Sequence, residues 1–396
     1  MQKPLVAHRM ESIPFAGIRR VFDKASKLEA EGRRVIHFES GSPDFDTPAH
    51  IKSAAMKALE EGMVHYTPNA GIPVLREAMA DSIRQYKKLI YDPNAEIIIT
   101  AGGQEAMYLG LQATINPGDE VLVPNPGFGL FFSSIRLVGG IPISLPLNAE
   151  SGFVPDFEQA KRLVSERTRA VIVNSPHNPS GAVWSAKQIE AVCEFAKEFN
   201  LLLFSDEAYD RMLYEEEFIS PAGMQDMKKR TVILGSLSKT YAMTGWRIGY
   251  LAAPKEITDA ATRVQQNLML SLCAFAQAGA AAALKGPQEC VDEMVSEFNK
   301  RRLVILKGIE QSPGLACPFT PGGAFYFFVK HHVPGMDSAG VADYLLEESG
   351  VAVVPGTEFG TEGEGFFRIS YARSMDDCKE GMDRIAEAMT RLMERS

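Results

Sequence analysis

The sequence predicts an α/β fold, in which a large domain holds a mostly parallel β-sheet sandwiched by helices and both chain ends form a smaller α+β domain. Two observations support this prediction. The middle of the 396-residue chain alternates short apolar runs with amphipathic helical stretches. The runs show no polar alternation, as expected for strands that are buried on both faces of a helix-covered sheet. The expected strands are residues 96–100, 120–124, 141–147, 170–174, 201–206, 232–237 and 248–252.

Helix start signals lie between these runs. Ser185 is followed three positions later by Gln188, the pattern of a capping box, and predicts a helix from there to about residue 199. Thr47 and Pro48 suit the cap and the first turn of another helix, over residues 49–61. The connections therefore have the helical character that parallel strands require.

The last hundred or so residues have a different pattern. We expect one long helix, three strands and a closing helix there, over residues 290–311, 324–330, 351–354, 366–371 and 376–393. The N-terminus also lies outside the sheet-forming segments, so we expect it to pack with this part. The predicted organisation is an N-terminal arm and part of the small domain (1–49), a large domain (50–285) and a small C-terminal domain (286–396).

Composition excludes several classes of partner. The net charge of −9 disfavours nucleic acid and anionic membrane surfaces. The five cysteines are widely spaced without a CxxC pair, which argues against a disulfide framework and a structural zinc site. No run of ~18 apolar residues predicts a membrane span, and the first residues lack the apolar core of a secretory signal. We therefore expect a cytoplasmic protein.

Unusual polar residues follow nearly every expected strand. In open α/β sheets, ligands bind outside the carboxyl ends of the strands, so these residues are candidates for a binding site. A lysine beside a buried strand needs a reason, because burying an ammonium is costly, and use as a nucleophilic amine supplies one. The candidates are Gly102, Gly103, Gln104, Asn178, Asp206, Tyr209, Ser236, Lys239 and Arg247.

The segment Ser236-Leu-Ser-Lys239, followed by Gly245-Trp-Arg247-Ile-Gly, is the most specific signal. With the segments after the other strands, it resembles the class I/II aminotransferases of the fold-type I pyridoxal-phosphate enzymes, of the aspartate aminotransferase-like kind. The resemblance covers about residues 38–371. It implies the cofactor pyridoxal 5'-phosphate and a homodimer with shared active sites.

The resemblance also implies catalytic roles. Lys239 matches the lysine that holds the cofactor as a Schiff base and then moves the proton at the substrate Cα. Asp206 resembles the carboxylate that holds the proton on the ring nitrogen. Tyr209 and Asn178 match the partners of the cofactor's 3' oxygen. Asn178-Pro179 and Asn125-Pro126 lie where relatives often have cis peptide bonds.

Other positions match groups that hold the phosphate and the ring. Backbone N–H groups at a helix N-terminus form an anion site, and glycine permits close approach. The matching residues are Gly102, Gly103, Gln104, Ser236 and Arg247. Tyr66 resembles a tyrosine that reaches the phosphate of the neighbouring subunit, and Phe128 the aromatic residue that stacks on the ring. Simple packing is the alternative interpretation of both aromatic residues.

Arg368 resembles the arginine that binds the substrate α-carboxylate, and it would otherwise be awkward to bury between apolar neighbours. Gly41 would offer a backbone N–H to the same carboxylate, and Asn178 would lie beside it. Residues 321–326 match a segment that lines the site, in which Phe325 is equally compatible with a plain core position.

The predicted function is transfer of an amino group from an L-amino acid to a 2-oxo acid, with 2-oxoglutarate as the expected acceptor. Aspartate, aromatic, alanine and broad donor specificity stay open, and Gln104 is uncharged where some aspartate-specific relatives have lysine. The alternative is a carbon–sulfur β-lyase with the same fold and cofactor. A dehydrogenase is disfavoured because no G-x-G-x-x-G follows the first strand. A catalytically dead regulatory domain is disfavoured because Lys239 and Asp206 are both present.

Overall fold

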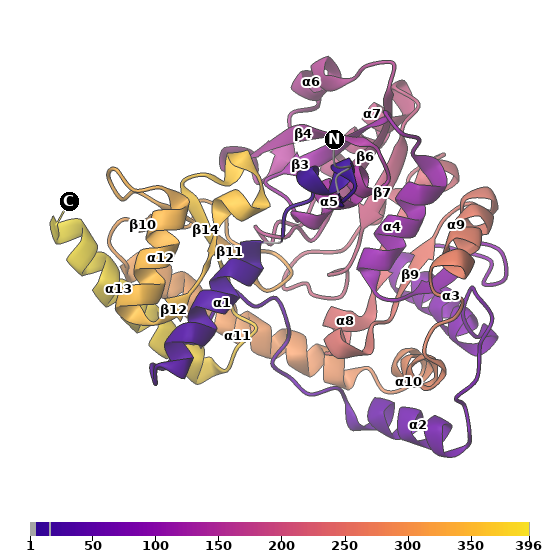
Figure 1. Ribbon diagram of the computed structural model, residues 1–396, viewed down its shortest axis with the longest axis horizontal. Helices are drawn as coiled ribbons and strands as arrows, with labels where there is room; N and C mark the ends of the chain where they lie inside the picture. Colours follow the sequence, from indigo (N-terminus) through magenta and orange to yellow (C-terminus); the bar gives the residue numbers. More distant parts are fainter. Residues whose placement is uncertain (1–4, 16, 396) are drawn as a thin grey trace.

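An eight-stranded β-sheet forms the centre of the larger part of the molecule (Figure 1). The computed structural model describes residues 5–15 and 17–395. In spatial order, the strands are β2 (Ile97–Thr100), β9 (Gly249–Ala252), β8 (Thr231–Ser236), β7 (Leu202–Asp206), β6 (Thr168–Asn174), β3 (Glu120–Asn125), β4 (Ile141–Asn148) and β5 (Val154–Pro155). The predicted α/β class and all seven predicted strands of the sheet are confirmed.

The sheet is mostly parallel, with β9 and β5 antiparallel to their neighbours. The strands β6, β7 and β8 run in the same direction, and Asn174 lies opposite Asp206 where the first two end. Their carboxyl ends therefore meet at one edge of the sheet. The strands β2, β3 and β9 are buried along their whole length, and β4 is the most exposed strand of the sheet.

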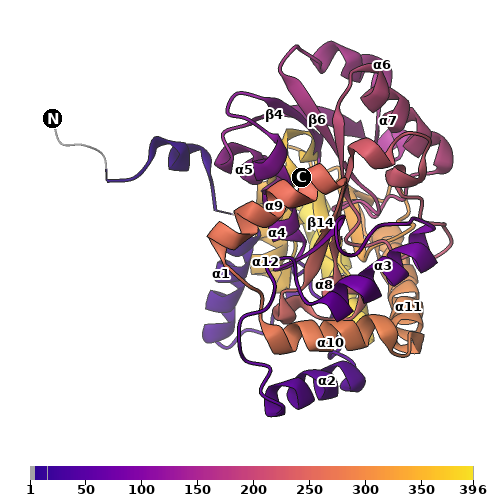
Figure 2. The same ribbon diagram turned by 90° about the vertical axis from the view of Figure 1, so that its right-hand side faces the viewer.

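Helices cover both faces of this sheet. The helices of this larger part are α2 (Ala49–Glu60), α3 (Pro73–Lys87), α4 (Gly103–Thr114), α5 (Leu130–Leu137), α6 (Phe157–Ala160), α7 (Ala186–Glu198), α8 (Leu237–Thr240), α9 (Lys255–Leu268) and α10 (Ala274–Lys285). Figure 2 shows α2 and α10 packed together at one end of the molecule. No helix in the described residues is long and apolar enough to cross a membrane.

The capping box at Ser185 and Gln188 is confirmed at the start of α7. The predicted cap at Thr47 is wrong. Pro48 occupies the N-cap position of α2 and no side chain caps this helix. The Thr47 hydroxyl instead donates to the Ala242 carbonyl at 2.7 Å and accepts from Trp246 at 3.0 Å. The Thr47 hydroxyl therefore binds groups that are distant in the sequence rather than capping the helix as local sequence predicts.

The smaller part contains a four-stranded antiparallel sheet in the order β10 (Leu315–Ala316), β11 (Tyr326–His331), β14 (Phe366–Ser370) and β13 (Val354–Pro355). Its helices are α11 (Glu289–Gln311), α12 (Ser338–Ser349) and α13 (Met375–Arg395). The single strand predicted over 351–354 is wrong, because the chain changes sheets between β12 (Val351–Ala352) and β13.

Both ends of the chain meet in this part. The strand β1 (Ile36–His37) pairs in parallel with β12, and α1 (Gly17–Ala30) contacts β12 and β13. The domain boundaries near residues 49 and 285 stay predictions. Short 3-10 helices complete the chain: η1 (His8–Ser12), η2 (Ala149–Ser151), η3 (Lys161–Leu163), η4 (Pro221–Gly223), η5 (Lys228–Arg230), η6 (Thr244–Trp246), η7 (Gly356–Phe359) and η8 (Thr361–Gly363).

Candidate functional site

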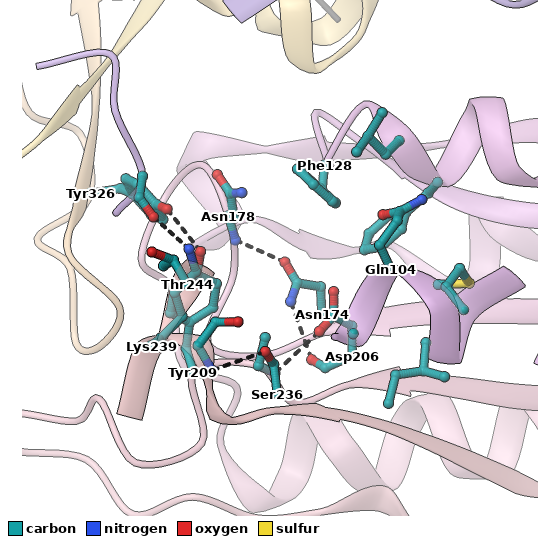
Figure 3. A pocket seen from close by; sticks show the side chains of 18 of the residues that line it. Gln104, Phe128, Asn174, Asn178, Asp206, Tyr209, Ser236, Lys239, Thr244 and Tyr326 are labelled. Carbon is teal, nitrogen blue, oxygen red and sulfur yellow. Dashed lines mark hydrogen bonds between the residues drawn. The ribbon is translucent and has the colours of Figure 1, made fainter. Parts of the chain in front are cut away.

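A cavity of about 400 Å³ lies where the carboxyl ends of β6, β7 and β8 face the smaller sheet (Figure 3). Both sheets contribute to its lining, so the packing of the two parts creates it. Most of the candidate residues selected from the sequence line it: Gly41, Gly103, Gln104, Phe128, Asn178, Asp206, Tyr209, Ser236, Lys239, Arg247 and Arg368. The candidates outside this lining are Gly102, which adjoins Arg247, and Tyr66.

Lys239 projects into the cavity from α8, the one-turn helix that follows β8. Its Nζ donates to the Gly41 carbonyl at 2.5 Å, and no carboxylate in the described residues forms an ion pair with it. Burial, together with Arg368 and Arg247 nearby, lowers the pKa of Lys239 to about 8. A buried amine with a lowered pKa is available as a nucleophile near neutral pH.

Asp206 ends β7 and faces the same cavity. Its Oδ1 accepts from the Ala208 N–H at 3.1 Å, and its backbone carbonyl accepts from Asn174 Nδ2 at 3.2 Å. The pKa of Asp206 is raised to about 7, mainly by burial and also by the charge of Glu207, while the hydrogen bond from Ala208 and the charge of Lys87 oppose the rise. The carboxylate therefore lacks a strong partner within the protein and is poised to receive a proton or a cationic group.

Asn178 connects the two sheets. Its backbone N–H donates to Asn174 Oδ1 at 2.8 Å, and its own Oδ1 accepts from Arg368 Nη1 at 3.0 Å. The peptide bonds Asn178-Pro179 and Asn125-Pro126 are both cis, and so is Ser175-Pro176. Asn174 was not among the residues predicted from the sequence, because an asparagine that ends a strand has no local signature of function.

Arg368 lies on β14 and is only 1% exposed. Its Nη2 donates to the Glu39 carbonyl at 2.6 Å, and its guanidinium lies 4.3 Å from the ring centre of Tyr326. Its Nε has no hydrogen-bond partner, and no carboxylate in the described part of the chain pairs with it. A buried cation held by neutral groups is expected to bind an anion, because it is costly to leave unpaired.

Tyr209 and Tyr326 form a hydroxyl pair, with their oxygens 2.8 Å apart. Tyr209 follows β7, whereas Tyr326 comes from β11 of the smaller sheet. Burial raises the pKa of Tyr209 well above its usual value, so the phenol stays neutral. The sequence indicated the segment that contains Tyr326 but not this residue, and Phe325 beside it is a fully buried core residue.

A second anion site lies at the N-terminus of α4. Gly102 caps this helix with a φ of 83°, and a Cβ there would lie 2.5 Å from Arg247 Nη2. Arg247 is exposed and donates to the carbonyls of Thr244 at 3.0 Å and Ala101 at 3.2 Å. Free N–H groups, a guanidinium and the Ser236 hydroxyl are the kinds of group that can bind a phosphate, so this is a candidate anion site.

Gln104 and Phe128 line the cavity on the side of α5. The Gln104 amide donates to Ser134 Oγ at 2.9 Å, and the Phe128 ring packs edge-to-face on Phe131 with centroids 5.5 Å apart. Tyr66 is 83% exposed and lies outside this lining, so a contact with a neighbouring subunit stays a prediction.

A second cavity of about 540 Å³, partly lined by α1, adjoins the first, and the two share the residues Ile18, Gly41, Phe128 and Leu130. Further lining comes from Phe22, Phe359 and the carboxylates Glu39 and Glu358. Within the described residues, no group of three His, Cys, Asp or Glu side chains could hold a metal ion.

Known proteins share this architecture over the full chain. The family described as "Aminotransferase class I and II" matches residues 33–385. The aspartate aminotransferase of Pyrococcus horikoshii is 37% identical over 393 residues, covering 98% of each chain. Aromatic-amino-acid aminotransferase 2 of Thermococcus litoralis is 37% identical over 387 residues, covering 97% of this chain and 98% of the relative.

A solved structure of Thermus thermophilus aspartate aminotransferase with maleate superimposes with a TM-score of 0.92 at 37% identity. The match covers 98% of this chain and 100% of that chain. These similarities extend over nearly the whole chain. The protein therefore belongs to the class I and II aminotransferases.

Proposed function

We propose that this aminotransferase uses pyridoxal 5'-phosphate, bound through Lys239, to move an amino group from an L-amino acid to a 2-oxo acid, with 2-oxoglutarate as the expected acceptor. One observation carries the proposal. The buried amine of Lys239 shares a single cavity with a carboxylate, an anion site and an unpaired guanidinium. Each of these groups matches one feature of the cofactor or of an amino acid.

The residues fit the cofactor. Gly102, Gly103, Gln104, Ser236 and Arg247 form an anion site for the phosphate. The Asp206 carboxylate suits a protonated ring nitrogen, and the phenol of Tyr209 and the amide of Asn178 suit the ring oxygen. Phe128 would pack on the ring face.

When bound, pyridoxal phosphate supplies a carbonyl that accepts the amino group and a ring that takes up electrons. Asp206 would hold the proton on the ring nitrogen and so favour this uptake. Lys239, once free as an amine, would take the proton from the substrate Cα and return it at the neighbouring position. Arg368 would bind the α-carboxylate with two N–H groups, while the Gly41 N–H would assist.

The lining of the second cavity suggests that the amino donor has a large apolar side chain. Its walls include Ile18, Phe22, Phe128, Leu130 and Phe359. The two carboxylates in this lining, Glu39 and Glu358, are paired with His37 and Arg20, and Arg19 also borders the cavity, so the preference rests on the apolar walls. We therefore propose that aromatic donors react faster than aspartate.

We also propose that the protein acts as a homodimer. Arg247 borders both the first cavity and an apolar groove that contains Met56, Leu59, Met269 and Phe275. A second copy on this groove would cover the exposed guanidinium and bring its Tyr66 toward the phosphate site. A cytoplasmic location is consistent with the five cysteines, all of which are free.

An absorbance spectrum of the purified protein with added pyridoxal phosphate tests the proposal. We expect a visible band that bleaches on addition of an amino acid, fastest with aromatic donors. Absence of any band would contradict the cofactor assignment. A persistent band with release of ammonia and a 2-oxo acid would instead indicate the β-lyase.

Hybrid dimers test the shared site. The Lys239→Ala and Tyr66→Ala variants should each be impaired alone. When they are mixed, one site of each hybrid combines an intact Lys239 with an intact Tyr66, so activity should return. No recovery in a mixture shown to form hybrids would contradict the contribution of Tyr66 across the interface.

A further inference from the structure

A buried ion cluster lies between the end of α3 and the turn that follows β7. Lys87, the last residue of α3, has a side chain that is 2% exposed. Its Nζ binds Glu207 Oε2 and lies 2.6 Å from Asp210 Oδ2. The rings of Phe218 and Tyr250 flank the ammonium, at 5.1 and 5.7 Å.

The two carboxylates belong to the turn that carries the site residues. Glu207 follows Asp206 directly, and Asp210 follows Tyr209 directly. The turn is closed by a hydrogen bond from the Asp210 N–H to the Glu207 carbonyl at 3.2 Å. One ammonium therefore bridges the two residues that bracket Ala208 and Tyr209.

Glu207 is itself held firmly. Its Oε1 accepts from Ser205 Oγ at 2.8 Å and from Ser220 Oγ at 2.6 Å, and its side chain is 1% exposed. With Lys87 on the other oxygen, the carboxylate has a partner on each side. Such a fully satisfied buried network fixes its members in one arrangement.

We propose that Lys87 is a positioning residue of the active site, which bridges Glu207 and Asp210 and so holds the turn that presents Asp206 and Tyr209 to the cavity. This inference rests on the proposed function, since it concerns residues assigned to the cofactor. Lys87 itself touches neither the cavity nor any group that reacts.

The cluster also sets the charge near Asp206. The charged and titratable groups around Asp206 are Glu207, Lys87 and Tyr209 on the protein side, and Lys239, Arg247 and Arg368 along the cavity. One ammonium faces two carboxylates, so the cluster carries one net negative charge. Loss of the ammonium would add a second negative charge and oppose ionisation of Asp206.

The test measures pyridoxal phosphate binding to the apoprotein as a function of pH. In Lys87→Met we expect the dissociation constant at the alkaline plateau to rise about tenfold, and the acidic limit of binding to move to higher pH. Lys87→Arg keeps the charge, and a small cavity of about 30 Å³ beside Lys87 gives the larger group room. That variant should bind within about threefold of wild type.

If Lys87→Met fails to fold, the double variant Lys87→Met/Glu207→Gln provides the test instead. It keeps the net charge of the cluster but has no bridge. We expect its acidic limit to return to the wild-type pH, while its plateau affinity stays reduced. Wild-type affinity in this variant would overturn the positioning role.

Arg301→Met is the matched control. Arg301 is also a buried cation between two carboxylates, with Asp44 at 2.7 Å and Glu297 at 3.2 Å, but it does not line the cavity. We expect it to lower stability without changing the pH profile of binding. Equal shifts in Arg301→Met and Lys87→Met, or no shift in a folded Lys87→Met, would overturn the inference. Failure of the wild-type protein to bind pyridoxal phosphate would instead contradict the proposed function.

Discussion

Lys87 and Arg368 are both buried cations, but the protein surrounds them differently. Lys87 has two carboxylate partners and two flanking rings. Arg368 has one amide and one carbonyl as partners, and its Nε has none. Because an unpaired buried charge is costly, the difference indicates that the cluster around Lys87 stabilises the fold, whereas Arg368 is left ready for a ligand.

Lys239 belongs with Arg368 in this comparison, because its only hydrogen-bond partner among the described residues is the Gly41 carbonyl. The cavity is therefore lined by cations that lack carboxylate partners, Lys239 and Arg368. The neighbouring ion cluster contains a cation, Lys87, that has two carboxylate partners. Substitutions at Lys239, Lys87 and Arg368 and one pH titration test this contrast.

The largest effect is expected for Lys239→Ala. Loss of the amine removes both the attachment of the cofactor and the group that moves the proton, so turnover should fall by about 10³-fold or more. Steady-state kinetics with an aromatic donor measure this loss, and circular dichroism checks that the fold survives. Wild-type turnover in the variant would refute the assignment of Lys239.

The next effect concerns stability. Lys87→Met leaves Glu207 and Asp210 without their shared partner, so the free energy of unfolding should fall by about 3–5 kcal/mol. Urea denaturation of the apoprotein measures the change. Arg368→Met, which removes a cation without a carboxylate partner, should have a clearly smaller effect. Equal losses in the two variants would contradict the contrast between these regions.

The stability of the apoprotein should also depend on the charge of Lys239. Its pKa is about 8 in the folded state, against a usual 10.5. Between these pH values the unfolded chain binds more protons, so wild-type stability should rise with pH relative to Lys239→Met. The difference should change by on the order of 3 kcal/mol across this window and stay constant below pH 8. A flat difference between pH 8 and 10 would show that Lys239 is not desolvated as the structure indicates.

The smallest effect is expected for Arg368→Ala in catalysis. Charged hydrogen bonds contribute about 1.5–3 kcal/mol, so KM should rise about 10- to 100-fold. Every amino donor should be affected alike, because all share the α-carboxylate. A rise confined to acidic donors would show that Arg368 binds the side chain instead. Arg368→Lys keeps the positive charge but cannot bind a carboxylate with two parallel N–H groups, so its KM should lie between those of the wild type and Arg368→Ala.

Much of the fold could be predicted from local sequence. A strand that is buried on both faces appears in the sequence as a run of apolar residues, whichever strands it pairs with. The capping box at Ser185 lies entirely within four consecutive residues. The wrong predictions concern segments in which groups distant in the sequence determine the local structure. The Thr47 hydroxyl is taken by Ala242, almost two hundred positions away, and the segment 351–354 divides between two sheets.

The sequence by itself determined the candidate residues, because burying the charges of Lys239 and Arg368 is costly without a purpose and the resemblance to a known family implied a role for each candidate. Only the tertiary structure decided which of these charges are paired. Lys87 meets Glu207 across 120 positions, Tyr326 meets Tyr209 across 117, and Arg368 meets Asn178 across 190. The cost of burying a charge depends on the groups that surround it in space, and local sequence does not specify those groups.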